Sequence, residues 1–484
     1  MFPINYINTN KCINCMKFSS DIVIGLEIHV ELDTETKLFC GCSTANAEPN
    51  THCCEVCLGH PGSKPVINKK AIDFALKLAL ALNCNISSQL IFSRKSYFYP
   101  DMAKNYQITQ YEIPLGKGGE LKLKSGKPIG IVRVHIEEDP ASLVHEGGMH
   151  VAKTVLVDYN RSGRPLVEIV TQPDLESPDE ARDFMRELIR ILTYLKIFDL
   201  NKGIIKADAN VSIRESGYVR SEVKNITGFK EIERALNYEV ERQRRAVKEG
   251  VHLKQETRSW DSAEGITREL RTKETEEDYG YIFDPDLVVT EITQDMIKKA
   301  KAELPELAQE KVEKFIEKYK IDKVDAEVLS QHLDLAELFE RIAKKVEPVF
   351  TARWLRKELL RVLNYNKLTL EKSAIDEKNL TALLKLLIDK KITPQIGRKL
   401  IEDLVLTSFD VEDRVKKEGL AAVSDTAELE KLCKEAIEEN PRAIEDYKSG
   451  EEKALNFVIG QVMKKTKGKA TPNHVRKILK QLVR

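Results

Sequence analysis

No stretch of this 484-residue chain approaches the roughly 18 consecutive apolar residues that a membrane-spanning helix needs. The N-terminus also lacks the basic and then apolar layout of a secretory signal. Neither charge is in excess, because Lys+Arg and Asp+Glu number 77 each. A net charge of zero argues against a protein whose whole surface coats nucleic acid, although a local basic patch is compatible with it. We therefore expect a cytoplasmic protein with no membrane partner.

Several catalytic signatures are also missing. The chain has no Gly-Lys-Ser/Thr phosphate-binding loop, no Gly-x-Ser-x-Gly nucleophile elbow and no Ser/Lys signature of the amidase type. The glycine-rich run Gly116 to Gly119 is more typical of a hairpin turn. The sequence thus argues against a P-loop enzyme and against a serine hydrolase.

The chain is too long for one ordinary core, and about two to four domains are expected. Residues 1–20 are Asn-rich and irregular, which predicts an N-terminal extension. Residues 21–293 alternate strand patterns with Gly and Pro, whereas Lys, Glu, Leu and Ala at helical spacing dominate afterwards. We predict an α+β protein, with a strand-rich mixed domain over 21–293 followed by an all-helical C-terminal half, divided into 294–410 and 411–484.

Two predicted strands have charged and polar side chains on one face. Gly25, Glu27, His29 and Glu31 alternate with apolar residues, and the run 205–214 places Lys206, Asp208, Asn210, Ser212 and Arg214 on one side. Residues 219–224 form a shorter and looser strand pattern. Helices are predicted after Ser177-Pro178-Asp179-Glu180, which has the form of a capping box, and over 229–247.

The cysteines favour a metal site over disulfides. There are nine, an odd number, and five of them cluster between residues 40 and 57. Cys40 and Cys42 form one close pair, and Cys54 and Cys57 form a second. Two close pairs can surround one tetrahedral zinc ion, and four thiolates leave no open position for a substrate. We therefore predict a structural zinc knuckle, with buried free thiols as the alternative and with Cys53 as a spare.

Acidic residues point to a second metal. Glu27 and His29 share a strand face, Glu137-Glu138-Asp139 ends another strand, and Asp208 and Glu222 lie on two more. Carboxylates with one imidazole, drawn from several strands, suit a magnesium ion that meets substrate phosphates. Ordinary charged strand faces explain the same pattern, so both interpretations stay open.

Three further segments have a functional and a structural interpretation. Cations and rings interleave over residues 93–111 and could hold phosphates and stack on a base, or form a solvated hairpin. In the polar loop over 157–170, Asn160, Arg161 and Glu168 could line a pocket or brace a turn. The run from Lys464 to Arg484 contains basic but no acidic residues, which fits an RNA-facing element or a solvated helix face.

Taken in order, these segments resemble the B subunits of the aspartyl/glutamyl-tRNA(Asn/Gln) amidotransferases. The run Asp-x-Asn-Arg-Ser-Gly-x-Pro-Leu-x-Glu-Ile-Val from Asp158 is highly specific, and the resemblance covers nearly all of the chain after about residue 21. The other matching stretches are Gly25–Glu31, Lys37–Ser43, Cys57–Gly62, Ser93–Tyr111, His135–Asp139, Ala207–Asn225 and Gly460–Met463. Ala103 departs from the family's usual Pro, and Asn105 stands where the family has Gly or Asn, a residue that tolerates positive φ.

The resemblance implies an ATP-dependent ligase that works in a heterotrimeric complex. Its A subunit is an amidase that releases ammonia from glutamine, and its small C subunit completes the complex. The B subunit binds misacylated Asp-tRNA(Asn) or Glu-tRNA(Gln), phosphorylates the side-chain carboxylate with ATP and forms the amide. The family fold comprises a cradle domain, a helical domain and a tail that reaches the tRNA.

The resemblance also suggests residue roles. Glu27, His29 and Glu138 are expected to bind Mg²⁺, and Glu138, Glu137, Asp208 and Glu222 are the candidate catalytic acids and bases. The residues expected at ATP phosphates or the tRNA 3′ end are Arg94, Lys95, Tyr97, Tyr99, Arg161 and Lys224. Those expected to meet tRNA in the tail are Lys464, Lys465, Lys467 and Lys469.

Two alternatives remain. The related archaeal E subunit has the same cradle with an inserted domain, and no such insertion is visible near residues 250–330. A non-enzymatic zinc-containing tRNA-binding adaptor would explain the cysteines and the basic C-terminus equally well.

Overall fold

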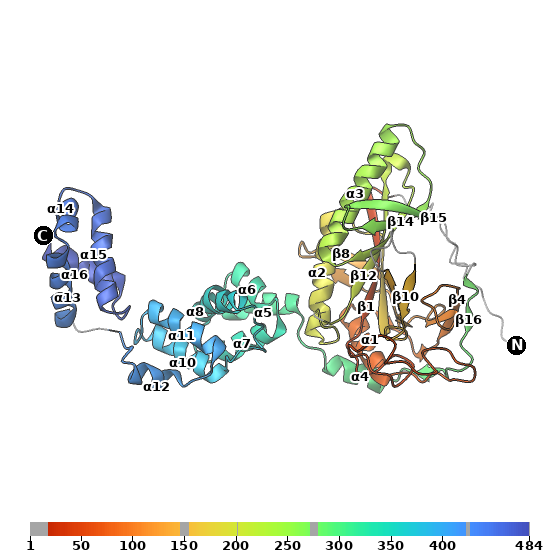
Figure 1. The fold of residues 1–484 in the computed structure, drawn as a ribbon, viewed down its shortest axis with the longest axis horizontal. Helices are drawn as coiled ribbons and strands as arrows, with labels where there is room; N and C mark the ends of the chain where they lie inside the picture. Colours follow the sequence, from red (N-terminus) through yellow and green to blue (C-terminus); the bar gives the residue numbers. More distant parts are fainter. Residues whose placement is uncertain (1–17, 146–153, 201, 272–278, 423–425, 484) are drawn as a thin grey trace. The chain divides into compact units, whose positions relative to one another are not determined.

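The computed structural model describes residues 18–145, 154–200, 202–271, 279–422 and 426–483. The predicted extension lies largely outside these residues, together with Cys12 and Cys15. The chain forms two compact units, Met1–Pro305 and Glu306–Arg484 (Figure 1). Within the described residues, no helix is long and apolar enough to cross a membrane.

The first unit is built on a ten-stranded sheet in the order β15-β14-β13-β12-β1-β11-β8-β6-β2, with β7 paired to β8. All of its pairs are antiparallel except β13 with β14. The strands are β1 (Ile22–Glu31), β2 (Asn85–Ile86), β6 (Gly116–Lys117), β7 (Glu120–Lys122), β8 (Pro128–Glu138), β11 (Pro165–Thr171), β12 (Ile205–Ile213), β13 (Ser221–Thr227), β14 (Glu256–Asp261) and β15 (Ile266–Arg271). The strands predicted from alternation are confirmed as β1 and β12, and they lie side by side.

Alternation fixes which face of the sheet is apolar. Ile24, Leu26 and Ile28 of β1 are fully buried, while Glu27 and His29 on the other face stay partly accessible. Helices α2 (Pro178–Tyr194) and α3 (Phe229–Lys248) pack against each other, and α3 packs on β12 and β13 (Figure 1). The opposite face carries the charged side chains.

The start of α2 follows the predicted cap only in part. The Ser177 hydroxyl accepts a hydrogen bond from the Glu180 amide at 3.2 Å, with Pro178 at the first helical position. The Glu180 carboxylate accepts from the Glu176 amide at 2.8 Å, one residue before the cap.

Ser177→Ala is expected to destabilise the first unit by about 1 kcal/mol, because the Glu180 amide then loses its acceptor. Chemical unfolding of the protein would measure the loss. Ser177→Asp keeps an acceptor and should retain the wild-type stability; equal losses in both variants would contradict the capping role.

Smaller elements surround the sheet. They are α1 (Lys69–Ala81), β3 (Gln89–Leu90), β4 (Ser93–Ser96), β5 (Tyr106–Thr109), β9 (Ser142–His145), β10 (Val155–Asp158), β16 (Ile282–Phe283), β17 (Thr290–Glu291) and α4 (Gln294–Ala302). Asn105, in the turn before β5, has a φ of 58°, as its tolerance for positive φ predicts. Between β1 and α1 the chain runs from Leu32 to Asn68 without a helix or strand.

All regular secondary structure in the described residues of the second unit is helical, as predicted. Its helices are α5 (Ala308–Tyr319), α6 (Lys323–Leu329), α7 (Leu333–Ala343), α8 (Pro348–Trp354), α9 (Leu360–Tyr365), α10 (Glu377–Ile388), α11 (Pro394–Leu406), α12 (Val411–Lys417), α13 (Thr426–Glu439), α14 (Pro441–Lys448), α15 (Glu452–Lys465) and α16 (Pro472–Leu482). Pro348, Pro394 and Pro441 each occupy a first helical position, where the missing N–H costs nothing. One apolar cluster spans Phe315 to Val415 and another spans Leu429 to Val483.

Candidate active site and cysteine cluster

A cavity of about 350 Å³ opens on the charged face of the sheet. Strands β1, β8, β11, β12 and β13 supply its floor, and β4 and β5 supply part of its wall. Its charged lining residues are Glu27, His29, Glu31, Lys95, Glu137, Asp139, Arg161, Glu168, Lys206, Asp208 and Lys224. The cavity therefore brings together strands that are far apart in the chain, from Glu27 to Lys224.

The centre of this cavity is a histidine between two glutamates. His29 Nε2 lies 3.4 Å from Glu137 Oε1 and 3.5 Å from Glu168 Oε2. These three side chains have ligand atoms within 4.8 Å of one another, so they are able to hold one metal ion. His135 Nε2 lies 3.3 Å from Glu168 Oε2 and supports the group from β8.

The strand register explains this grouping. β1 lies between β11 and β12, so that His29 is opposite Glu168 on one side and Lys206 on the other. Glu168 in turn is opposite His135 on β8. Because paired residues in a sheet point to the same face, three strands direct their polar side chains to one point.

The charges shift the pKa values in opposite directions. Burial works to lower the pKa of His29, but its pairing with Glu168 and the charge of Glu137 prevail, and the pKa rises to about 9. Burial works to raise the pKa of Glu168, but His135 and His29 hold it well below its usual range. With these pKa shifts, His29 is expected to be an imidazolium between two carboxylates at neutral pH.

A second charged group adjoins the first. Lys224 Nζ lies 3.0 Å from Asp208 Oδ2 and 3.2 Å from Glu222 Oε1. Asn210 donates to Glu27 Oε1 at 3.2 Å, while the side-chain oxygen of Asn210 is buried with no hydrogen-bond partner among the described residues. Burial and the negative charges of Glu168 and Glu222 raise the pKa of Glu27. A further positive charge beside Glu27 would therefore be electrostatically favourable.

The structure separates Glu138 from the other predicted magnesium ligands. Neighbouring residues on a strand point to opposite faces, so Glu137 enters the cavity and Glu138 does not. The Glu138 carboxylate instead pairs with buried Lys104 and accepts from the Ile108 amide at 2.8 Å. Glu27 and His29 remain together at the cavity, with Glu137 and Glu168 beside them.

The predicted phosphate-binding residues divide between two places. Lys95, Tyr97, Arg161 and Lys224 line the cavity. Arg94 is held away by Asp284 and Asp286, with N–O distances of 2.8 and 2.9 Å, and its guanidinium stacks on Tyr106. Tyr99 is 59% exposed and is not among the residues that line the cavity.

Residues of the polar loop over 157–170 both line the cavity and brace a turn. Arg161 lines the cavity and forms a bidentate pair with Asp139, and Glu168 joins the histidine group. Asn160 braces the turn, because its side chain accepts from the His52 amide at 2.7 Å and donates to the Glu48 carbonyl at 2.7 Å.

Sequence reasoning did not assign Glu168 or His135 to the metal group, and it gave Lys206 no role. His135 lies within an alternating pattern and Glu168 within an apolar strand, so neither stands out locally. Only the pairing of β11 between β1 and β8 brings them together.

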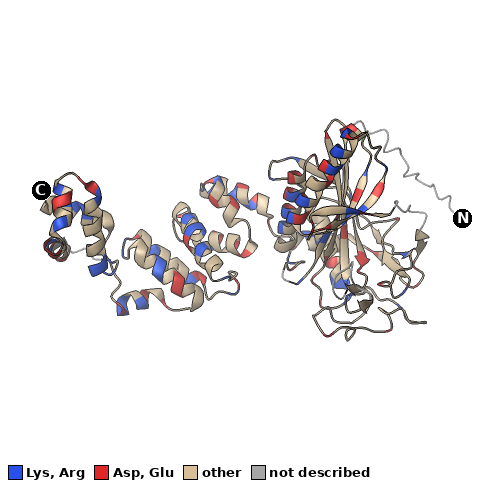
Figure 2. Ribbon diagram, turned by 45° about the horizontal axis from the view of Figure 1, so that its top comes forward, with Lys and Arg blue, Asp and Glu red and all other residues tan. Residues whose placement is uncertain are grey.

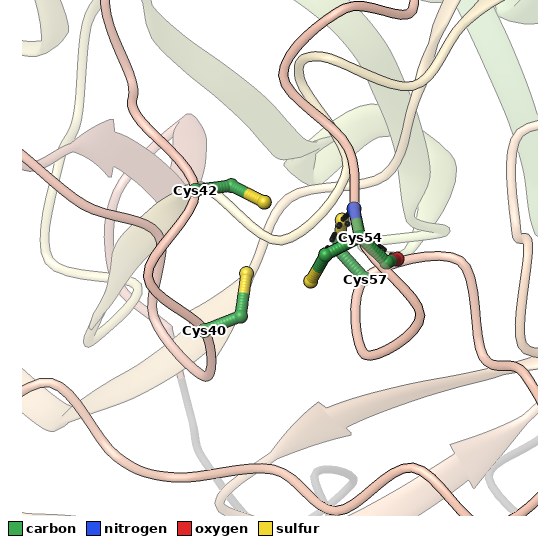
Figure 3. Close-up of side chains that lie close together, drawn as sticks. All are labelled: Cys40, Cys42, Cys54 and Cys57. Carbon is green, nitrogen blue, oxygen red and sulfur yellow. Dashed lines mark hydrogen bonds between the residues drawn. The ribbon is translucent and has the colours of Figure 1, made fainter.

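The four predicted cysteines lie together. Cys40 and Cys42 approach from one loop and Cys54 and Cys57 from a second, with their side chains directed toward one another (Figure 3). Their sulfurs lie within 4.8 Å of one another, and those of Cys54 and Cys57 are 4.0 Å apart. Tetrahedral zinc with Zn–S bonds of about 2.3 Å requires sulfurs about 3.8 Å apart, so the set fits zinc. Cys53 lies outside the set, with its sulfur 3.7 Å from Asn160 Oδ1.

The predicted tail lysines flank the end of α15. Lys464, Lys465 and Lys467 are exposed and Lys469 is half-buried. Lys465 already pairs with Glu435 and Glu439, at 3.4 and 2.6 Å. Basic and acidic residues intersperse along the helices of this unit (Figure 2).

Comparison with known protein families agrees with the division of the chain into a sheet-containing first unit and a helical second unit. Residues 22–298 match the family described as the GatB/GatE catalytic domain, and residues 337–483 match the GatB domain. The fold and site therefore define a catalytic protein of the GatB/GatE class.

The curated relatives narrow the class further. The B subunit of the aspartyl/glutamyl-tRNA(Asn/Gln) amidotransferase of Carboxydothermus hydrogenoformans is 43% identical over 95% of this chain and 98% of its own length. The proteins of the same name from Moorella thermoacetica and Caldanaerobacter subterraneus are 43% and 42% identical, each over 99% of its length. The chain belongs to the GatB family, the B subunits of the aspartyl/glutamyl-tRNA(Asn/Gln) amidotransferases.

Proposed function

We propose that this chain activates and amidates the side-chain carboxylate of Asp or Glu carried by a misacylated Asp-tRNA(Asn) or Glu-tRNA(Gln). ATP supplies the phosphate, and ammonia comes from glutamine hydrolysed by the amidase (A) subunit, with the small C subunit in the same cytoplasmic heterotrimer. The observation that carries this proposal is the cavity centred on His29, Glu137 and Glu168, in a chain that matches the GatB family over nearly its whole length.

The cavity residues suit phosphoryl transfer between anions. A carboxylate is a poor electrophile and needs a phosphate leaving group before ammonia can attack it. His29, Glu137 and Glu168, with Glu27 beside them, would hold Mg²⁺, which neutralises phosphate charge when bound. Arg161, Lys206 and Lys95 line the same cavity and would bind phosphate oxygens.

The remaining acids are candidates for proton transfer. Ammonium must lose a proton before it attacks, and a carboxylate at the cavity can accept it. Asp208, which lines the cavity, and Glu222, which does not line it but pairs with the same Lys224, are proposed for this role. Glu138, buried against Lys104, is proposed to support β8 rather than to touch substrate.

The rest of the chain is proposed to hold the site and to reach the tRNA. The four cysteines would bind structural zinc. Residues 21–293 would form the cradle, 294–410 the helical domain and 411–484 the tail, in which Lys464, Lys465, Lys467 and Lys469 would meet tRNA phosphates.

Reconstitution tests the function directly. The chain, co-expressed with its amidase partner and its small partner, should convert Asp-tRNA(Asn) or Glu-tRNA(Gln) to the amide only with ATP and Mg²⁺. An absence of conversion with both tRNAs, together with retained tRNA binding, would favour the zinc-containing adaptor. Activity that requires an asparaginase-like partner would favour the archaeal E type.

Binding of Mg²⁺ should strengthen as the pH rises from 7 to 9. A metal binds the neutral imidazole, and His29 with a pKa of about 9 is protonated at pH 7, so binding must release a proton. The apparent affinity should increase about tenfold per pH unit and level off above pH 9.

Calorimetric titration with Mg²⁺ in buffers of different ionisation enthalpy measures the released proton. His29→Asn should abolish the release. A proton count of zero in the wild-type protein would remove His29 from the proposed ligands.

A further inference from the structure

Lys37 is a fully buried lysine that touches the cysteine cluster. Its relative exposure is 0%, and its ammonium donates to Cys57 Sγ at 3.4 Å and to the Tyr159 carbonyl at 3.1 Å. Among the described residues, no Asp or Glu lies within ion-pair distance of it. A buried ammonium without an anion costs several kcal/mol, so this position requires a negative charge nearby.

The cysteine cluster supplies that charge. Four thiolates around one Zn²⁺ carry a net charge of −2, and sulfur ligands in such sites accept hydrogen bonds from surrounding groups. Lys37 sits three residues before Cys40 in the chain, and its amide donates to the Cys42 carbonyl at 3.0 Å. One residue thus closes the first cysteine turn with its backbone and contacts the second pair with its side chain.

The same side chain reaches the turn that carries Arg161. The Tyr159 carbonyl accepts from Lys37, and the Ser162 hydroxyl donates to the Cys57 carbonyl at 3.3 Å. The Gly163 carbonyl accepts from the Leu38 amide at 2.8 Å. The turn over 159–163 is therefore fixed to the cysteine cluster, while Arg161 projects from it into the cavity.

We propose that Lys37 is the buried charge partner of the four-cysteine metal site and, through Tyr159, ties that site to the turn that places Arg161 in the cavity. Lys37 is a positioning residue in this account and does not touch substrate. The proposal rests on zinc binding by the four cysteines as proposed above.

The zinc affinity of a Lys37 variant tests whether the charge of Lys37 supports the metal site. In the purified complex, competition against a chelator should give Lys37→Met an affinity about 10–100-fold below wild type, the range for groups that support metal ligands. Lys64→Met, which removes a lysine whose side chain is 77% exposed, should leave the affinity unchanged. Wild-type complex without zinc would overturn zinc binding itself, whereas equal affinities of Lys37→Met and wild type would overturn only the role of Lys37.

A variant of one cysteine separates the effect of the Lys37 charge from the effect of Lys37 packing. Cys42→His replaces a thiolate with a neutral ligand and lowers the net negative charge of the site by one. Lys37→Met should then cost less zinc affinity than in the wild-type background. An undiminished cost would mean that Lys37 acts by packing, which overturns the charge role. If Lys37→Met does not fold, Lys37→Gln keeps a donor for Tyr159 without the charge and carries the same comparison.

Amide hydrogen exchange tests the connection to the cavity. With zinc held at saturation, the amides of residues 159–163 should exchange faster in Lys37→Met than in wild type. Unchanged exchange would overturn the link to the Arg161 turn.

Discussion

Glu137→Gln is expected to lower ATP-dependent transamidation about a thousandfold while the protein stays folded. Glu137 lies 3.4 Å from His29 and is able to share a metal ion with His29 and Glu168. A metal ion at phosphoryl transfer contributes several kcal/mol, and the loss of about 4 kcal/mol corresponds to about a thousandfold in rate. Gln keeps the size of the side chain but removes the charge, so the loss should fall on chemistry rather than on packing.

The measurement is the single-turnover rate of amide formation on misacylated tRNA at saturating ATP. Transfer of phosphate to the substrate should fall in parallel, whereas glutamine hydrolysis by the amidase partner should continue. Glu120→Gln, on β7 and outside the cavity, serves as the control and should keep the wild-type rate. A Glu137→Gln rate within a factor of a few of wild type would remove Glu137 from the reaction.

Local patterns in the sequence predict much of the fold. Strict alternation identifies β1 and β12, and the change to helical spacing identifies the all-helical second unit. Such patterns depend on residues close in the chain, which share one face of a strand or helix. They carry no information on which strands pair, so the placement of β1 between β11 and β12 was open.

Because the sequence does not show which strands pair, it predicted only in part which acidic residues lie together at the cavity. Glu137 and Glu138 are adjacent acids, and sequence alone gives no reason to direct one rather than the other into the cavity. The register of β8 against β11 settles their faces, since it places His135 opposite Glu168. Four cysteines in two close pairs were predictable because their geometry is set locally by loops, whereas the acidic group depends on several strands.

Removal of two of the proposed zinc ligands is expected to have the largest effect on stability. The chain from Leu32 to Asn68 contains no helix or strand, and loops of this length are rare in compact domains unless something else holds them. Its cross-links to the rest of the unit include the Asn50 side chain, which donates to the Val157 carbonyl at 3.0 Å. The four cysteines join two parts of this segment, because the sulfurs of Cys40 and Cys42 lie within 4.8 Å of those of Cys54 and Cys57.

The double variant Cys54→Ser/Cys57→Ser should therefore be isolated without zinc and should unfold its first unit at least about 5 kcal/mol more easily. Structural zinc contributes apparent free energies of about 10–16 kcal/mol in zinc-finger peptides, and the packed sheet retains part of the stability here. Elemental analysis and chemical unfolding, each with and without chelator, measure the two effects. Cys53→Ser, next in the chain but outside the set of four sulfurs, should keep both zinc and stability. Retention of zinc by the double variant would contradict the assignment of these ligands, because two remaining thiolates cannot complete a tetrahedral site.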